Sequence, residues 1–172
     1  ALNIINQFRD SDEISVTNVY SNNKNSPFFN SQDDSKVSTS CFSNDQLSSS
    51  VFEELKTIDP DLIVLAGFLR KIPDTYIDYF ENKIINIHPS ILPSYGGKGM
   101  YGSKIHNKVI ENNESETGIT IHYVSNQYDS GEIIFQKKII IEDNDTAKSI
   151  EEKIHILEYE YYPKVIQSLL IK

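Results

Sequence analysis

The stretch that decides the fold is Ile-Ile-Asn-Ile-His-Pro-Ser-Ile-Leu, residues 84–92. Its β-branched residues predict a strand, and side chains two residues apart on a strand project from the same face, so Asn86 and His88 converge. Pro89 lacks a backbone N–H and cannot continue a central strand, so the strand ends where this polar pair appears. Open α/β sheets bind ligands at the carboxyl ends of their strands, and we therefore expect a reaction site here.

The segments on either side of this strand alternate between strand and helix. Residues 60–67 form a continuous apolar run between turn residues, which predicts a buried parallel strand. Further strands are expected at about 13–20, 37–42, 117–124 and 132–141, and helices at about 1–9, 27–33, 45–56, 74–81, 103–112 and 146–170. Asp45 is the expected N-cap of its helix. This order predicts an α/β fold with a single doubly wound, mostly parallel open sheet and an antiparallel edge.

The composition favours one domain and excludes several kinds of partner. The chain has 172 residues, of which 38% are hydrophobic, so one domain over residues 1–172 can bury a core. A net charge of -9 without a basic run argues against nucleic acid and anionic membranes as partners. Cys41 is the only cysteine, which excludes an intrachain disulfide and favours a reducing cytoplasm. The histidines lack metal-ligand spacing, so no metal is expected.

Three motifs along the chain carry a resemblance to a known family. They are Leu-Ala-Gly-Phe-Leu-Arg at 65–70, Asn-Ile-His-Pro-Ser-Ile-Leu-Pro at 86–93 and Tyr-Asp-Ser-Gly at 128–131. Together they resemble the folate-dependent formyltransferases over essentially the whole chain, most strongly from Ile58 to Pro163. The resemblance implies a Rossmann-like formyltransferase fold and transfer of the formyl group of 10-formyltetrahydrofolate to the amine of glycinamide ribonucleotide in purine synthesis. It also implies small-molecule substrates and a monomer or homodimer.

The implied reaction explains the residue types. An amine that attacks a formyl carbon builds a tetrahedral intermediate with negative charge on the former carbonyl oxygen, and Asn86 can donate an amide N–H to that oxygen. Loss of one such donor typically costs about 2.7–4 kcal/mol of transition-state stabilisation. His88 can share this role when protonated, or can transfer a proton. By resemblance Asp129 is the third catalytic residue. It would keep His88 charged or oriented, or hold a relay water, and these alternatives stay open.

The resemblance also assigns residues to the two substrates. The folate is expected to contact Leu65, Arg70, Lys71, Ile72, Ile77, Val124, Tyr128 and Asp129, with the backbone of residues 70–72 along the pterin. The ribonucleotide is expected to contact Asn86, Pro89, His155 and Glu158. Judged without the resemblance, Arg70 and Glu158 would be surface charges and Asp129 a turn former. The apolar residues Leu65, Ile77, Ile84 and Val124 would be core residues first. His106 and His122 are interpreted as structural.

A glycine-rich segment, residues 95–102, follows the Asn86 strand. Its glycines and Lys98 could cradle a phosphate, but no strand leads directly into it and no Ser or Thr follows Lys98 as a P-loop requires. We interpret it as a mobile loop in which Lys98, Met100 and Tyr101 could cover the cleft.

The N-terminus departs from the family pattern. Family members begin with a strand and a Gly-Ser-Gly-Ser-Asn type loop that binds the substrate phosphate at a helix N-terminus. Ala1 starts just after this loop, so the first strand and the phosphate loop are missing from the sequence. We expect a fragment of a longer natural chain in preference to a degenerate homologue, because the downstream catalytic pattern is intact.

Rival functions remain for the same pattern. Formyltetrahydrofolate deformylase shares the Asn-His-Asp set, but commonly has a second histidine in place of Pro89 and an N-terminal regulatory domain. Methionyl-tRNA formyltransferase has a C-terminal RNA-binding domain, and this acidic chain stops at Lys172. Both are disfavoured. A noncatalytic folate- or nucleotide-binding homologue would keep the pocket without turnover, and stays open.

Overall fold

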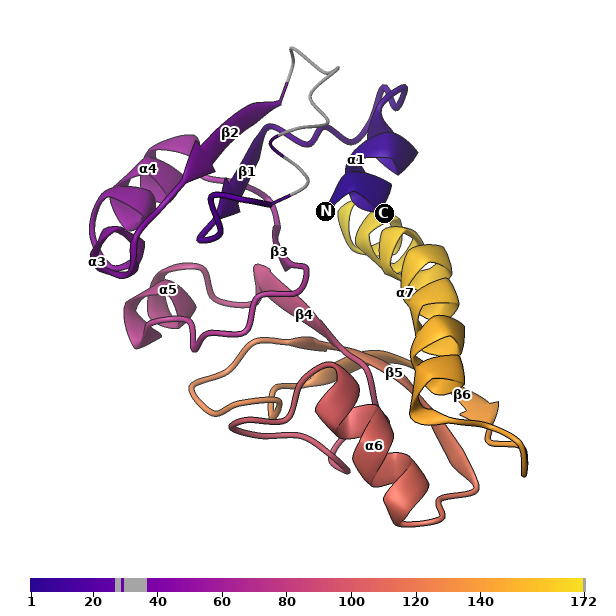
Figure 1. Ribbon diagram of the computed structural model, residues 1–172. Helices are drawn as coiled ribbons and strands as arrows, with labels where there is room; N and C mark the ends of the chain where they lie inside the picture. Colours follow the sequence, from indigo (N-terminus) through magenta and orange to yellow (C-terminus); the bar gives the residue numbers. More distant parts are fainter. Residues whose placement is uncertain (27–28, 30–36, 172) are drawn as a thin grey trace. The chain divides into compact units, whose positions relative to one another are not determined.

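The computed structural model describes residues 1–26, 29 and 37–171, and the chain divides into two compact units. The first unit consists of Ala1–Asp61 and Gln167–Lys172, and the second of Leu62–Ile166. Figure 1 shows the elements in chain order, coloured from indigo to yellow. The helix expected at 27–33 lies almost entirely outside the described residues.

Within residues 1–26 and 37–61, the first unit contains a small parallel sheet and three short helices. Strand β1 (Asn18–Ser21) pairs in parallel with β2 (Ser38–Cys41). The helices are α1 (Leu2–Phe8), α3 (Asn44–Leu47) and α4 (Ser50–Ile58). Helix α4 buries Val51 and Leu55, one turn apart on one face, as an amphipathic helix should.

The single helix expected at 45–56 is instead the pair α3 and α4, so that prediction is wrong. The cap of α3 is Ser43 rather than Asp45, because the backbone N–H of Ser43 donates to Gln46 Oε1 at 2.8 Å in a capping box. The break between the helices falls at two serines, where Ser49 Oγ donates to the Asp45 carbonyl at 2.7 Å. Serine side chains compete with the helix for backbone hydrogen bonds, which explains the interruption.

The second unit is built on a four-stranded sheet with the order β3-β4-β5-β6. Its strands are β3 (Ile63–Leu65), β4 (Ile84–His88), β5 (Glu116–Tyr123) and β6 (Ile133–Ile140). Its helices are α5 (Asp74–Tyr79), α6 (Ser103–Glu111) and α7 (Ala147–Leu170), the last residues of which belong to the first unit. Strand β3 runs parallel to β4, whereas β4-β5 and β5-β6 are antiparallel.

These pairings confirm an α/β fold with parallel strands and an antiparallel edge. The described strands form two hydrogen-bonded sheets, β1-β2 and β3-β4-β5-β6, where the sequence predicted one. Among the described residues, no helix combines the length and the apolar character that crossing a membrane requires.

The core of the second unit lies along β4, β5 and α7. Ile85, Ile119 and Ile121 are completely buried. Ile119 packs in one cluster with Ile150 and Ile154, which are also completely buried and lie one turn apart on α7. Figure 1 shows α6 and α7 beside the sheet strands. The site-bearing strand β4 is therefore held in place by packing as well as by hydrogen bonds.

Strand β3 is half-buried along its length, so the prediction of a fully buried strand is wrong. The reason is its position, since β4 is its only partner in the described sheet. The buried Tyr162 of α7 supports its end, because the phenol O–H donates to the Leu65 carbonyl at 2.9 Å and lies 3.3 Å from the Ile85 carbonyl. A carbonyl that is partly shielded from water needs such a partner, and α7 supplies it.

Candidate functional site

Strand β4 carries Asn86 and His88, the polar pair predicted from the sequence. It ends at His88, directly before Pro89, and Asn86 and His88 project from the same face. The neighbouring strand β5 runs antiparallel, so that Asn86 lies opposite His122 and His88 lies opposite Thr120. His88 is 4% exposed and Asn86 is half-buried. The His88 side chain is therefore shielded from water, whereas Asn86 keeps part of its surface accessible.

Asp129 reaches this pair from the loop between β5 and β6. Its Oδ1 lies 3.6 Å from His88 Nδ1 and 3.8 Å from His122 Nε2. Its Oδ2 accepts a hydrogen bond of 2.8 Å from the backbone N–H of Gly97. The backbone of Asp129 has φ +53°, a left-handed conformation that Asp tolerates better than most residues. The structure thus brings the three residues expected to be catalytic into one cluster.

His122 is the member of the cluster that sequence reasoning missed, since it was interpreted as structural. Its Nδ1 lies 2.8 Å from the Tyr123 carbonyl, which can only accept, so Nδ1 carries the hydrogen. Burial lowers the pKa of His122, which favours the neutral ring. Nε2 is then an acceptor, and it lies 3.3 Å from Asn86 Nδ2. His122 therefore turns the amino group of Asn86 toward itself and fixes the direction of the amide.

A signal for His122 was present in the sequence. It is the next-to-last residue of β5, shortly before the loop that carries Asp129, and His88 is the last residue of β4. What the sequence did not show was the register that sets it opposite Asn86. His106, the other histidine interpreted as structural, is buried on α6, and burial lowers its pKa.

The proton on His88 is fixed by the loop that follows β4. His88 Nε2 lies 2.8 Å from the carbonyl oxygen of Tyr95, and a carbonyl can only accept. Nε2 must therefore carry a hydrogen. The other ring nitrogen, Nδ1, is the one that faces the carboxylate of Asp129 and can gain or lose a proton there.

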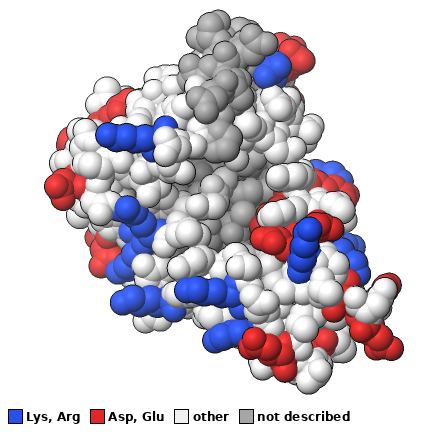
Figure 2. All heavy atoms as spheres, in the orientation of Figure 1, with Lys and Arg blue, Asp and Glu red and all other residues white. Residues whose placement is uncertain are grey.

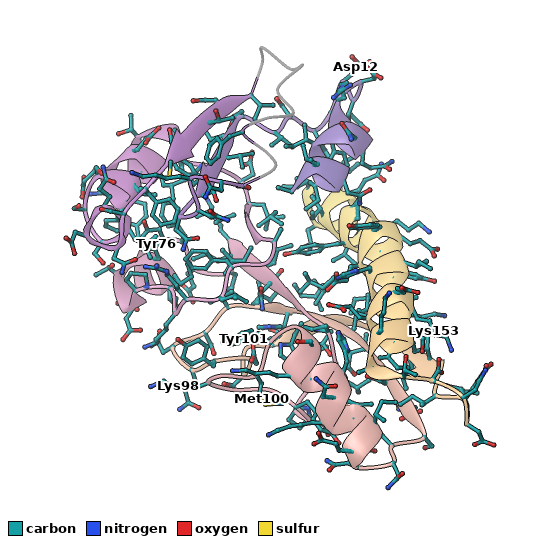
Figure 3. All side chains as sticks on the ribbon, viewed as in Figure 1. Asp12, Tyr76, Lys98, Met100, Tyr101 and Lys153 are labelled. Carbon is teal, nitrogen blue, oxygen red and sulfur yellow. The ribbon has the colours of Figure 1, made fainter. Side chains whose placement is uncertain are left out.

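Glycines allow this loop to come close to Asp129. A Cβ on Gly96 would lie 2.7 Å from the Leu92 side chain and 3.3 Å from Asp129 Cβ, so only glycine fits without displacement. Gly97 has φ +97°, which also favours glycine. Figure 3 shows Lys98, Met100 and Tyr101 farther along the same loop. Figure 2 shows Lys and Arg side chains as well as Asp and Glu side chains on this face of the acidic chain.

The residues expected to contact folate occupy several elements of the second unit. Leu65 is half-buried at the end of β3 and lies opposite Asn86 in the β3-β4 pairing. Val124 follows β5, and its backbone N–H donates to the Ile84 carbonyl at 2.9 Å. Ile77 is half-buried on α5. Leu65 and Val124 thus border β4, the strand that carries Asn86.

The other expected folate residues lie in loops. Arg70 and Lys71 are exposed, and Lys71 Nζ pairs with Asp74 Oδ1 at 2.8 Å. Ile72 is 6% exposed and belongs to the core. Tyr128, directly before Asp129, is 37% exposed.

The residues expected to contact the ribonucleotide lie on β4 and α7. Pro89 follows His88 and is half-buried. Glu158 is half-buried on α7, and burial raises the pKa of its carboxyl. It lies one turn before Tyr162, which contacts the carbonyls of β3 and β4. His155 is exposed, with its ring stacked on Tyr159 at a centroid distance of 6.2 Å.

The described part of the chain contains no group of three or more His, Cys, Asp and Glu side chains arranged to hold a metal ion. The cluster of Asn86, His88, His122 and Asp129 instead offers an amide donor, a histidine with one exchangeable nitrogen and a carboxylate. Such a set can stabilise an oxyanion and move a proton.

Comparison with known proteins agrees with this chemistry. The family model described as formyl transferase matches residues 2–166. The chain is 43% identical over 120 residues to phosphoribosylglycinamide formyltransferase of Bacillus subtilis (strain 168), an alignment that covers 70% of this chain and 59% of the relative. It is 40% identical over 117 residues to the chloroplastic phosphoribosylglycinamide formyltransferase of Vigna unguiculata. That alignment covers 68% of this chain and 38% of the relative. The aligned part therefore spans less than two thirds of either relative.

A solved structure extends the similarity to nearly the whole chain. The fold matches the crystal structure of phosphoribosylglycinamide formyltransferase from Bacillus halodurans with a TM-score of 0.86 at 28% identity. This match covers 99% of the present chain and 89% of the other.

Proposed function

This chain belongs to the formyl transferase family, and on that premise we propose that it transfers the formyl group of 10-formyltetrahydrofolate to the amine of glycinamide ribonucleotide. The names of the relatives support the choice of substrate. The observation that carries the proposal is the convergence of Asn86, His88 and Asp129, with 3.6 Å between His88 Nδ1 and Asp129 Oδ1. These groups match the needs of formyl transfer between two nitrogens.

In the proposed reaction the substrate amine attacks the formyl carbon. A C–N bond forms, and the carbonyl electron pair moves onto the oxygen. The amide of Asn86 carries two N–H groups, of which one faces His122 Nε2, and we assign the second to the developing oxyanion. A donor whose direction is fixed before the reaction needs no reorganisation when the charge appears.

Collapse of the intermediate breaks the bond between the formyl carbon and N10 of the folate. The attacking amine loses a proton and N10 gains one, so that tetrahydrofolate leaves neutral at that nitrogen. We assign this proton movement to His88 Nδ1, because Nε2 is engaged with the Tyr95 carbonyl. Asp129 would hold the protonated ring by its negative charge.

We assign the remaining predicted residues to substrate contacts. Leu65, Ile77 and Val124 would border the pterin, and the backbone of residues 70–72, with Tyr128, would lie along it. Pro89, His155 and Glu158 would contact the ribonucleotide. The half-buried carboxyl of Glu158, one turn before Tyr162, supports a contact with a ribose hydroxyl in particular.

The same proposal covers the organisation of the protein. We propose that residues 1–172 act as one formyltransferase domain, as a monomer or homodimer, without a metal ion and without nucleic acid or membrane partners. A cytoplasmic location fits the exposed free thiol of Cys41, which stays reduced there.

The test is an assay of formyl transfer by the complete natural protein with glycinamide ribonucleotide and 10-formyltetrahydrofolate. The readout is release of tetrahydrofolate with and without the ribonucleotide. We expect release only when the ribonucleotide is present. Release that does not need it would identify a deformylase, and folate binding without any release would identify a noncatalytic binding protein.

A further inference from the structure

Tyr95 joins the proposed catalytic cluster to a distant part of the second unit. Its carbonyl oxygen lies 2.8 Å from His88 Nε2. Its phenol O–H donates to Glu114 Oε1 at 2.6 Å and accepts a hydrogen bond of 2.8 Å from Asn112 Nδ2. Asn112 and Glu114 lie in the turn between α6 and β5. One residue therefore links this turn to His88.

The backbone of Tyr95 has a conformation that needs outside support. Its φ is +58°, in the left-handed region where a bulky residue is rarely found, so the backbone is strained at this residue. The conformation persists because both ends of the residue are held, the phenol by two hydrogen bonds and the carbonyl by His88. Loss of the phenol contacts would remove the support on the side away from the cluster.

The loop segment that contains Tyr95 also holds Asp129. Two residues after Tyr95, the backbone N–H of Gly97 donates to Asp129 Oδ2. Gly96, between them, has no side chain and lies against Leu92 and Asp129. A displacement of Tyr95 would therefore move the acceptor of His88 and the donor of Asp129 together.

We propose that Tyr95 is a positioning residue for formyl transfer. Its phenol, held by Asn112 and Glu114, keeps its carbonyl on His88 Nε2, so that Nδ1 is the nitrogen that exchanges a proton beside Asp129. The kinetic part of this proposal rests on the proposed function, whereas the effect on the His88 ring does not. The two can therefore be tested separately.

The first measurement is the tautomer of His88 by ¹⁵N NMR of the imidazole nitrogens at alkaline pH, where histidines are neutral. A His88→Asn variant assigns the signals. The wild type should show hydrogen on Nε2. Tyr95→Phe, which keeps the ring and removes the hydroxyl, should add a population with hydrogen on Nδ1. The matched control is Tyr79→Phe on α5, whose ring is 52% exposed and which should leave the His88 signals unchanged.

The second measurement is steady-state kinetics of the same proteins. Tyr95→Phe should lower kcat roughly ten- to hundredfold, since small misplacement of reacting groups has effects of this size, and leave the KM of both substrates within about twofold. Glu114→Ala should act in the same direction. Glu114→Gln keeps an oxygen acceptor for the phenol and should restore most of the activity. If Tyr95→Phe does not fold, Glu114→Ala replaces it in both measurements, because it removes the same hydrogen bond of the phenol.

A wild-type His88 with hydrogen on Nδ1 would overturn the proposal. An unchanged tautomer and kcat in both Tyr95→Phe and Glu114→Ala would also overturn it, even if both variants melted earlier, because Tyr95 would then be merely structural. If the tautomer changes as expected but the wild type transfers no formyl group, the proposed function fails and the positioning of His88 by Tyr95 stands.

Discussion

Asn86 on β4 and His122 on β5 lie directly opposite each other in an antiparallel pair, with 3.3 Å between Asn86 Nδ2 and His122 Nε2. The pairing matters because His122 has its Nδ1 hydrogen on the Tyr123 carbonyl and its burial favours the neutral ring. A neutral ring presents a lone pair to Asn86, and that lone pair decides which end of the amide faces it.

His122→Leu should lower kcat of formyl transfer roughly ten- to hundredfold, because the Asn86 amide loses the acceptor that orients it. His122→Gln offers an oxygen in place of Nε2 and should retain more activity than His122→Leu. Steady-state kinetics of both variants checks this. Equal activity of the two variants would contradict an orienting role.

Gly96→Ala should lower kcat while leaving the protein folded. The new methyl group would lie 2.7 Å from the Leu92 side chain and 3.3 Å from Asp129 Cβ, so it would push the loop and Asp129 apart. Gly99→Ala is the control, since a Cβ there meets nothing within 4 Å and brings only the strain of a positive φ. Kinetics and thermal unfolding of both should show loss of kcat mainly in Gly96→Ala. An equal loss in both would assign the effect to loop strain.

Tyr162→Phe should destabilise the protein by about 1–3 kcal/mol, the usual cost of leaving a buried polar group without its partner. The variant removes the hydroxyl that donates to the Leu65 carbonyl and leaves the buried ring in place. Urea denaturation measures the change. Tyr159→Phe, on the same helix but 61% exposed, should change the free energy of unfolding by less than about 0.5 kcal/mol. Similar values for the two variants would argue against the Leu65 contact.

The stability of the protein should fall as the pH decreases below 6.5, in part because of His106. Burial lowers the pKa of His106 from 6.5 in the folded chain, with Glu151 acting in the opposite direction and His155 in the same direction. Above pH 6.5 the ring is neutral in both states, so stability is unaffected. Below it the unfolded chain binds a proton that the folded chain does not, which favours unfolding.

Urea denaturation of the wild type and of His106→Gln, from about pH 7.5 to about pH 5.5, checks this pH dependence. Whatever the absolute stability of the variant, its free energy of unfolding should fall less steeply with decreasing pH. Burial also lowers the pKa of His122, so His122 likewise favours unfolding at low pH. This contribution is present in both proteins. Parallel curves for the two proteins would contradict the assignment to His106.

The sequence predicted the parts of the site that depend on local pattern. The period of two along β4 set Asn86 and His88 on one face, and Pro89 marked the end of the strand. Asp129 could be named only through the resemblance, because a single Asp before Ser-Gly usually forms a turn. His122 and the Tyr95 carbonyl required the register of β4 with β5 and the return of the loop onto His88, and these are long-range contacts.

The fold predictions failed for related reasons. An apolar run does not indicate whether its strand has a neighbouring strand on both sides. We therefore predicted that β3 is buried, although β4 is its only partner in the described sheet. The apolar pattern of residues 45–56 fits one helix, but the hydrogen bonds of Ser43 and Ser49 divide it. The exposure of β3 depends on which strands pair with it, and the division of the helix depends on side-chain hydrogen bonds of serines. The apolar pattern of the sequence predicts neither contact.

The central claim is that Asn86 supplies an oxyanion donor for formyl transfer to glycinamide ribonucleotide. Its most direct test is kcat/KM for this reaction in the complete natural protein and in its Asn86→Ala variant. We predict ribonucleotide-dependent transfer by the wild type and a loss of about 10²–10³-fold in the variant, the usual effect of removing one such donor. Transfer by Asn86→Ala at the wild-type rate would contradict the claim.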